Sequence, residues 1–428
     1  MSEELAAEPL GGSWRRYGQL AVLVLVGGCV YPLVYLRQNY EVTMLEAFGV
    51  SIGELAGCYA LLGAMFMATY LPSGWLADRV SCRGLITFSL AATGALGLWF
   101  ATLPGLTELR LIYLGWGIST GLTFWSALIK AVAVLAQPAE QGRFFGILDG
   151  GRGLVEAALA TIAVSIFAWV MADAAADPTT GLERVIVFYV ACLFVMAPVA
   201  WLTVDDTSVA PAPSGSGLSR TLLVDLKDLF RRPELWLVAF IILCGYQLVW
   251  ATASTAAFLQ QAHGMTAVTV GVISVAQLWM RPLGAVGAGV LGDLTGREQV
   301  LAGLFLLASL AVGSMILVPS PGGDWLMLAI ALIVALATFA VRGLYWGSLE
   351  SCQVPARSKG LAIGAISLIG YSPDLYLPLV YGALLEAFPG RPGFSLYFGA
   401  VGAMGFAGAI AAWVLARRVR GSLNSESP

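Results

Sequence analysis

The turn that decides the fold is Gly74-Trp75-Leu76-Ala77-Asp78-Arg79-Val80-Ser81-Cys82-Arg83-Gly84, a charged stretch between two long apolar runs. A shorter copy, Gly289-Val290-Leu291-Gly292-Asp293-Leu294-Thr295-Gly296-Arg297, lies half a chain further on. In both copies a glycine precedes an aspartate by four residues, and the aspartates at 78 and 293 are 215 positions apart in a chain of 428. Because repetition at this scale indicates a duplicated unit, we predict one bundle built from two similar halves.

The composition indicates that lipid surrounds most of the chain. Apolar residues make up 58% of the sequence and charged residues only 11%, against about 25% charged in a typical soluble domain. The net charge of -3 gives no indication of a nucleic-acid partner. We therefore predict an all-α membrane protein whose main partner is the lipid bilayer.

A helix that crosses a membrane needs about 20 mainly apolar residues, and such runs predict twelve spans. The predicted spans are 17–36, 52–73, 84–103, 109–135, 144–171, 184–204, 234–259, 267–291, 299–318, 325–350, 360–386 and 394–416. The predicted domains are a tail (1–16), a six-helix bundle (17–204), a linker (205–233), a second six-helix bundle (234–416) and a tail (417–428).

Basic residues lie mainly on one side of the predicted bundle. If the N terminus is cytoplasmic, the opposite loops carry only Arg110, Arg184 and Arg391, and fifteen basic residues lie on the cytoplasmic side. Because short cytoplasmic loops are enriched in lysine and arginine, both termini and the linker are predicted to be cytoplasmic. We expect a monomer in the plasma membrane, that is, the inner membrane of a bacterium.

The repeat extends beyond the charged turns. The segment 46–51 matches 261–266 at the same offset of 215, and Glu156 matches Asp374 at an offset of 218. Several matches at nearly constant offset predict two pseudo-symmetric six-helix bundles related by an axis along the membrane normal.

Twelve spans, a long linker and the pattern Gly-x-x-x-Asp-Arg-x-x-x-Arg resemble the major facilitator superfamily. The resemblance assigns a gating motif to Gly74, Asp78, Arg79 and Arg83 in the first half, and to Gly289, Asp293 and Arg297 in the second. Leu294 stands where the first copy has Arg79. We expect Asp78 to meet the start of the eleventh span near 358–360, and Asp293 to meet the start of the fifth near 141–143, because helix N-termini favour negative charge. These contacts would latch the outward-open state.

Within the superfamily, Tyr35-Leu36-Arg37-Gln38-Asn39-Tyr40 resembles the first helix of organophosphate:phosphate antiporters, in which the arginine binds substrate phosphate. The segments 123–130, 140–143 and 150–153 resemble a bacterial permease group associated with sugar and sulfosugar catabolism. The antiporters use a second arginine in helix seven, whereas the offset places Thr252 opposite Arg37. A clamp made of two symmetric arginines is therefore not expected.

Five basic residues fall within predicted spans: Arg37, Lys130, Arg152, Arg281 and Arg342. An ionised side chain at the centre of a membrane helix costs about 2.5–3.5 kcal/mol, so these residues need a wet cavity or an opposite charge. We predict that Arg37, Arg281 and Arg342 bind an anionic group, because guanidinium groups bind carboxylate or phosphate through paired hydrogen bonds. The alternatives are an interfacial Arg37, and structural pairs of Arg281 and Arg342 with Asp374 or Glu350.

Two acids and several aromatic residues complete the predicted site. Asp374 and Glu156 are candidates for carrying a proton, since a buried carboxylate without a cationic partner is readily protonated. Glu156 has Arg152 one turn earlier as its expected mate. We expect Trp125, Tyr246, Gln247 and Trp346 to line the substrate pocket.

We predict a secondary transporter that moves a small organic anion by alternating access, driven by a proton or by exchange with a counter-anion. Sugar acids, sugar phosphates, sulfonates and carboxylates are the candidate substrates. The alternative is proton-driven efflux of a hydrophobic or cationic compound, and a membrane-embedded enzyme or sensor is a third possibility. The sequence shows no catalytic set, metal-ligand spacing or nucleotide motif, so we predict no enzyme activity, cofactor or metal.

Overall fold

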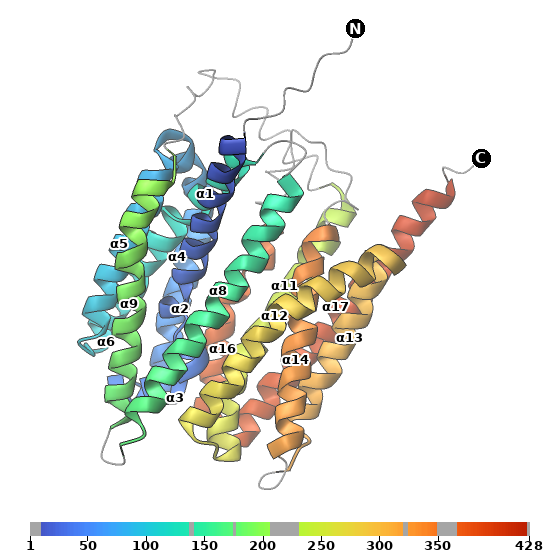
Figure 1. Cartoon of the computed structure of the whole chain (residues 1–428). Helices are drawn as coiled ribbons and strands as arrows, with labels where there is room; N and C mark the ends of the chain where they lie inside the picture. The colour runs from blue at the N-terminus through green and yellow to red at the C-terminus, as the bar shows by residue number, and fades with distance from the viewer. Residues whose placement is uncertain are drawn as a thin grey trace.

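The computed structural model of the chain describes residues 10–136, 141–173, 177–205, 231–319, 324–348 and 366–425. Helices are the regular elements of these ranges, which contain no strand (Figure 1). Eleven of the described helices are long and apolar enough to cross a membrane. The predicted span 360–386 begins outside the described residues, and its later part is helical at 366–370 and in α16 (Pro373–Ala387). The predicted all-α membrane fold is confirmed.

The helices fall into two groups along the chain. Those of the first half are α1 (Leu10–Cys29), α2 (Tyr31–Val34), α3 (Arg37–Phe48), α4 (Ile52–Arg79), α5 (Cys82–Phe100), α6 (Leu106–Trp116), η1 (Gly117–Leu122), α7 (Trp125–Leu135), α8 (Gln141–Val170) and α9 (Pro178–Thr203). Those of the second half are α11 (Pro233–His263), α12 (Ala267–Thr295), α13 (Arg297–Met315), α14 (Asp324–Tyr345), α16 (Pro373–Ala387) and α17 (Arg391–Ser425).

Helix caps repeat at the offset found in the sequence. Gly49 ends α3 and Gly264 ends α11, both with left-handed backbone angles (φ 61° and 67°) that glycine adopts without strain. Ser51 and Thr266 then cap the next helices by accepting a hydrogen bond from the N–H group three residues later. Two loops 215 residues apart are thus built in the same way.

The two halves meet along two matching pairs of helices. Helix α4 packs against α16, and α8 packs against α12. Small residues allow the first contact to be close: a Cβ atom added at Gly382 would lie 2.8 Å from the Ala56 Cβ, and one added at Gly63 would overlap the Asp374 carbonyl. Each half thus contributes one helix to each pair.

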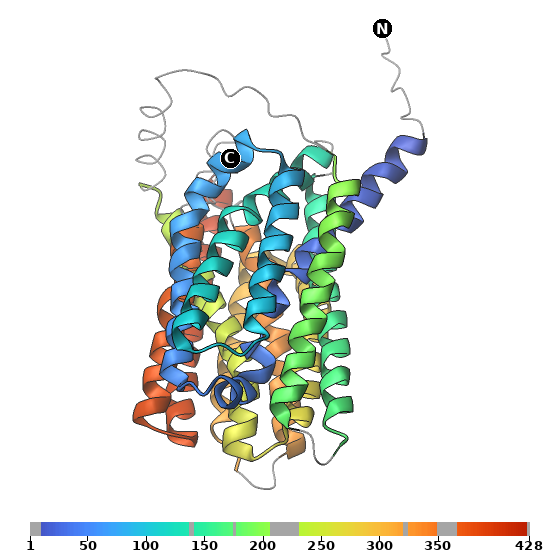
Figure 2. The same ribbon diagram turned by 90° about the vertical axis from the view of Figure 1, so that its left-hand side faces the viewer.

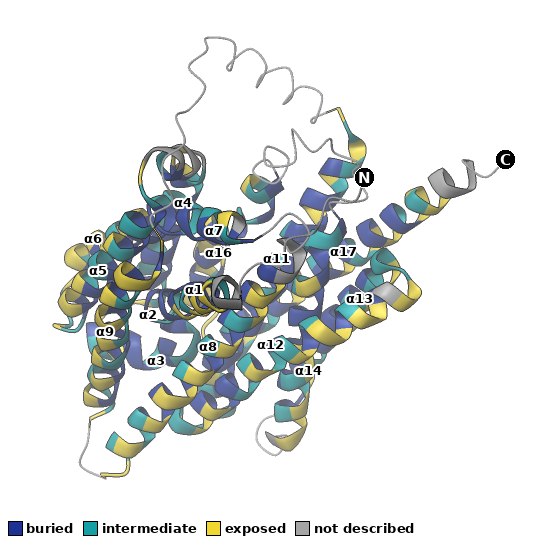
Figure 3. Cartoon of the chain, turned by 45° about the horizontal axis from the view of Figure 1, so that its top comes forward, coloured by how far each residue is buried: buried dark blue, intermediate teal, exposed yellow. Residues whose placement is uncertain are grey.

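The outer surface of the bundle is apolar. Trp169, Leu202 and Leu310 expose 76%, 82% and 64% of their surface, and exposed positions lie on the outward faces of the helices (Figure 3). Soluble monomers rarely expose so many large apolar side chains. Lipid is therefore the solvent for this surface, and the chain is a multi-pass membrane protein.

The terminal helices are longer than the sequence predicted. The first span runs from Trp14 to Phe48 rather than from 17 to 36, because the polar stretch after Leu36 remains helical and is buried inside the bundle. Helix α1 begins at Leu10 and α17 ends at Ser425, so both extend into the segments predicted as tails. The ends of the described chain lie at the same end of the bundle (Figures 1 and 2).

The contact between α4 and α16 gives a first prediction. We expect Gly63→Ala to lower the apparent melting temperature, because the added methyl group overlaps the backbone of Asp374 and overpacking costs about 1–3 kcal/mol. Gly57→Ala is the matched control on the same helix, since a Cβ atom there would meet no other atom within 4 Å. Equal melting temperatures for the two variants in detergent would contradict the predicted close contact.

Candidate functional site

The first span is broken where it faces the centre of the molecule. Helix α2 begins at Tyr31 with Pro32 in its first turn, and the backbone of Tyr40 inside α3 departs from helical geometry (φ -132°, ψ 27°). Proline lacks an N–H group and interrupts the hydrogen bonds of a helix. Membrane proteins tolerate such breaks where the backbone lines a cavity, and Tyr35 and Gln38 from this stretch do so.

Two other spans are irregular at the same depth. In the fourth span, α6 passes into the π-helix η1, from which Gly121 faces the centre. The regular α-helical hydrogen bonds are interrupted at Tyr371 and Ser372, where the Ser372 N–H donates to the Ile369 carbonyl three residues earlier, before α16 begins at Pro373. Irregular turns in membrane helices are frequent at functional sites, and all three breaks adjoin one cavity.

That cavity has a volume of about 530 Å³ and is lined by both halves of the chain. This volume is in the range found for sites that bind small organic molecules. Aromatic rings form much of its wall, among them Tyr31, Tyr35, Trp125, Tyr246 and Trp250. Two of these, Trp125 and Tyr246, were predicted to line the pocket.

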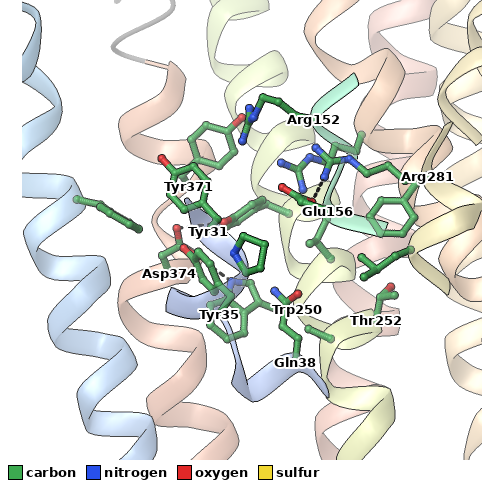
Figure 4. Close-up of a pocket in the computed structure, with 18 of the residues that line it drawn as sticks. Tyr31, Tyr35, Gln38, Arg152, Glu156, Trp250, Thr252, Arg281, Tyr371 and Asp374 are labelled. Atoms are coloured by element: carbon green, nitrogen blue, oxygen red, sulfur yellow. Dashed lines mark hydrogen bonds and ion pairs between the residues drawn. The ribbon is translucent and has the colours of Figure 1, made fainter. Parts of the chain in front are cut away.

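Basic and acidic groups cluster on one side of the cavity. The Arg281 Nη1 donates to the Glu156 Oε2, and the Arg281 Nη2 lies 3.6 Å from the Asp149 Oδ1. Figure 4 shows Arg152, Glu156 and Arg281 grouped together. Arg281 is only 7% exposed and lies on α12, whereas Glu156 lies on α8. The ion pair therefore joins the two halves of the protein.

The expected pair between Arg152 and Glu156 is wrong. The Arg152 Nε donates to the Gly27 carbonyl at 3.1 Å, and its guanidinium lies 5.1 Å from the centre of the Trp125 ring. The facing helix α12 supplies Glu156 with Arg281 instead. Arg152 also lines the cavity, although it was not among the predicted binding residues. Its position one turn before Glu156 was the feature of the sequence that could have indicated a place in the cavity wall.

Arg342 also lines the cavity, from α14. Its side chain forms no hydrogen bond or ion pair with any residue in the described ranges. The alternative pair of Arg342 with Asp374 is therefore not formed, and Glu350 lies outside the described residues. A guanidinium in the wall of a membrane cavity needs water or an anion to balance its charge.

Asp374 lies apart from this cluster, on the side of the cavity that holds Tyr31 and Tyr371 (Figure 4). Its Oδ1 accepts from the Trp250 Nε1 at 3.0 Å, and its Oδ2 accepts from the Tyr246 hydroxyl at 3.1 Å. Asp374 is 4% exposed and stands in the first turn of α16, where the helix dipole favours a carboxylate. Two neutral donors thus hold it.

Arg37 lies outside the cavity, contrary to the predicted role as a cavity ligand. It forms an ion pair with Glu41 one turn later and lies over the Tyr381 ring at 4.4 Å. The Tyr381 hydroxyl donates to the Glu41 Oε1 at 2.7 Å. Arg37 is not interfacial either, because α3 continues the first span to Phe48 and leaves Arg37 6% exposed. Glu41 is a partner that the sequence analysis missed.

The Arg37–Glu41–Tyr381 cluster connects the two halves on one side of the cavity. Arg37 and Glu41 belong to α3 in the first half, and Tyr381 belongs to α16 in the second. Further along α16, the Glu386 Oε1 accepts a hydrogen bond from the N–H of Gly53 in α4 at 2.9 Å. The protein is therefore held closed between the cavity and the face that carries residues 49–51.

The remaining predicted residues lie away from the cavity wall. Gln247 is buried in α11, and the Trp346 Nε1 donates to the hydroxyl of Tyr371, which itself lines the cavity. Arg83 of the gating motif stacks on Trp201 at 4.6 Å.

The rest of the gating motif is described only in part. Gly289 lies within α12, and Arg297 begins α13 beside Gly292. Residues 358–360 lie outside the described residues, as do the surroundings of Gly74 and the side chains of Asp78, Arg79, Asp293 and residues 141–143.

The sequence profile of the Major Facilitator Superfamily matches residues 35–378. The chain belongs to this superfamily. Membership of this superfamily, together with a cavity between the two halves of the chain, makes it a transporter that works by alternating access.

Two inner membrane proteins of Escherichia coli and one solved structure align with nearly the whole chain. Inner membrane protein YqcE of Escherichia coli is 27% identical over 383 residues, covering 88% of this chain and 89% of YqcE. Inner membrane protein YihN of the same organism is 24% identical over 414 residues, covering 95% of this chain and 96% of YihN. The crystal structure of a mutant of the nucleoside transporter NupG matches with a TM-score of 0.71 at 15% identity, covering 94% of this chain and 99% of that one.

The Arg37–Glu41–Tyr381 cluster gives a second prediction. We expect the Tyr381→Phe variant to open more often at the face that carries residues 49–51, because it loses the hydrogen bond to Glu41. Hydrogen bonds to charged groups contribute about 1.5–3 kcal/mol. The measurement is the rate at which maleimide labels a Ser254→Cys probe, since Ser254 is buried beside Arg37. Tyr40→Phe is the control, because the Tyr40 hydroxyl has no hydrogen-bond partner among the described residues. Equal labelling rates in Tyr381→Phe and the parent protein would refute this role.

Proposed function

We propose that the protein transports a small organic anion across the inner membrane of a bacterium. The observation that carries the proposal is Arg342, a cation in the wall of the cavity without a hydrogen bond or ion pair to any described residue. Arg152 and Arg281 bring two further positive charges to the same cavity, where Glu156, Asp374 and the nearby Asp149 supply negative charges. An anion bound at Arg342 would give this guanidinium a direct partner and replace its lost hydration.

The aromatic wall supports an organic rather than an inorganic anion. Rings such as those of Trp125 and Tyr246 offer flat apolar surface on which a carbon skeleton or sugar ring packs. Sugar acids, sugar phosphates, sulfonates and carboxylates have this combination of features. A clamp of two symmetric arginines is not supported, because Thr252, the counterpart of Arg37, hydrogen-bonds to Thr338 at 3.2 Å.

Export of a hydrophobic or cationic compound is the second candidate. Asp374, which has no cationic partner among the described residues, and the aromatic wall favour it. Three arginines in the same cavity oppose it, because like charges repel. Binding of tetraphenylphosphonium, with no binding of any anion, would favour this second candidate.

Arg342 gives the test of the proposed function. A thermal-shift titration with gluconate, glucose 6-phosphate, methanesulfonate and lactate identifies which anion stabilises the protein. We expect Arg342→Ala to weaken binding of that anion at least about tenfold, because a charged hydrogen bond contributes about 1.5–3 kcal/mol. Arg110→Ala removes an exposed arginine of α6 that does not line the cavity and serves as the control. Unchanged affinity in Arg342→Ala would contradict the proposal.

We also propose that both termini are cytoplasmic, as the distribution of basic residues predicts. The closed face at residues 49–51 would then be periplasmic, and the described state would face inward. A fusion of alkaline phosphatase to the C terminus is expected to be inactive, since this enzyme needs the periplasm to form its disulfides. A fusion after Gly264 is expected to be active, because this loop follows α11 at the opposite face. The reverse pattern would overturn this orientation.

A further inference from the structure

The ion pair between Arg281 and Glu156 is part of the cavity wall as well as a bridge between the halves. Both side chains line the cavity, and the side chain of Glu156 keeps 16% of its surface exposed. The Arg281 Nη2 makes no hydrogen bond with a described residue, although it lies 3.6 Å from Asp149. Arg281 therefore has donor capacity left over, next to the space where a substrate would bind.

The surroundings of Glu156 leave Arg281 as the cation that it contacts. Tyr31 faces it from α2 and Tyr189 from α9, and both side chains are neutral at physiological pH. Arg152 lies one turn earlier on α8 but turns to the Gly27 carbonyl. Asp149 lies 3.6 Å from the Arg281 Nη2, and Arg342 forms no ion pair with a described residue. The charge of Glu156 is thus balanced mainly by one guanidinium.

We propose that Glu156 takes up one proton when a substrate anion replaces it on Arg281. This inference rests on the proposed transport of an anion. A guanidinium offers a limited fork of donors, so a substrate carboxylate, sulfonate or phosphate competes with Glu156 for the same N–H groups. A buried carboxylate that loses its cationic partner binds a proton from water. The substrate and the proton thus enter the cavity together, without net charge when the substrate is a monoanion.

The same exchange couples occupancy to movement. Because Glu156 belongs to the first half and Arg281 to the second, replacing their ion pair by a substrate releases one direct bond between α8 and α12. Asp374 is not placed for this exchange, since its partners are the neutral donors of Tyr246 and Trp250. Binding of an anion to an arginine does not remove the Tyr246 or the Trp250 donor from Asp374.

The test is the pH dependence of binding of the anion that stabilises the protein among gluconate, glucose 6-phosphate, methanesulfonate and lactate. If one proton is bound with the anion, linkage requires Kd to fall about tenfold for each unit by which pH is lowered. A pH indicator in weakly buffered solution should show one proton taken up per anion bound. Glu156→Gln, which resembles the protonated state, is expected to bind the anion and to lose this pH dependence.

Glu386→Gln is the matched control, because Glu386 also bonds across the halves but lies outside the cavity; it should keep the parental pH dependence. Binding that is independent of pH in the parent protein would overturn the proton exchange and leave anion transport standing. Loss of the pH dependence in Asp374→Asn but not in Glu156→Gln would assign the proton to Asp374 and would also overturn the proposed exchange at Glu156. Binding of no anion in the set would overturn the proposed function and this inference together.

Discussion

The cost of a charge inside a membrane determines how the centre of this protein is built. Only 11% of the residues are charged, yet several of them lie at the interface between the halves. Three of them are held by definite partners: Arg281 by Glu156, Arg37 by Glu41, and Asp374 by two neutral donors. Breaking a buried pair leaves an uncompensated charge at a cost of several kcal/mol, so these contacts decide which arrangements of the halves are stable.

The contacts between the halves differ in kind from one place to another. Close packing of small residues joins α4 to α16, as at Gly382 and Ala56, and an ion pair joins α8 to α12. Packing of small residues holds in any medium, whereas an ion pair responds to anions and protons. One pair of helices is therefore suited to serve as a steady contact, and the other to sense the contents of the cavity.

The sequence predicted the fold well because bilayer thickness limits it so strongly. Apolar runs of about 20 residues and the repeat at 215 positions fix the spans and the two halves. The prediction also named Arg281, Arg342, Glu156 and Asp374, which the structure brings together around one cavity, although their roles stay predictions. It missed the partner of Glu156, because spacing along one helix says nothing about the helix that faces it. The prediction placed Arg37 in the cavity wall because it took the polar stretch after Leu36 as the end of the first span.

The contact at Gly63 places the wall of the cavity directly beside the close packing of α4 and α16. The peptide carbonyl of Asp374 lies against Gly63 of α4, while the carboxylate of the same residue faces the cavity. One amino acid therefore forms part of both the site and the framework, so a change of side chain at position 374 alters the site, whereas a change at Gly63 alters its support.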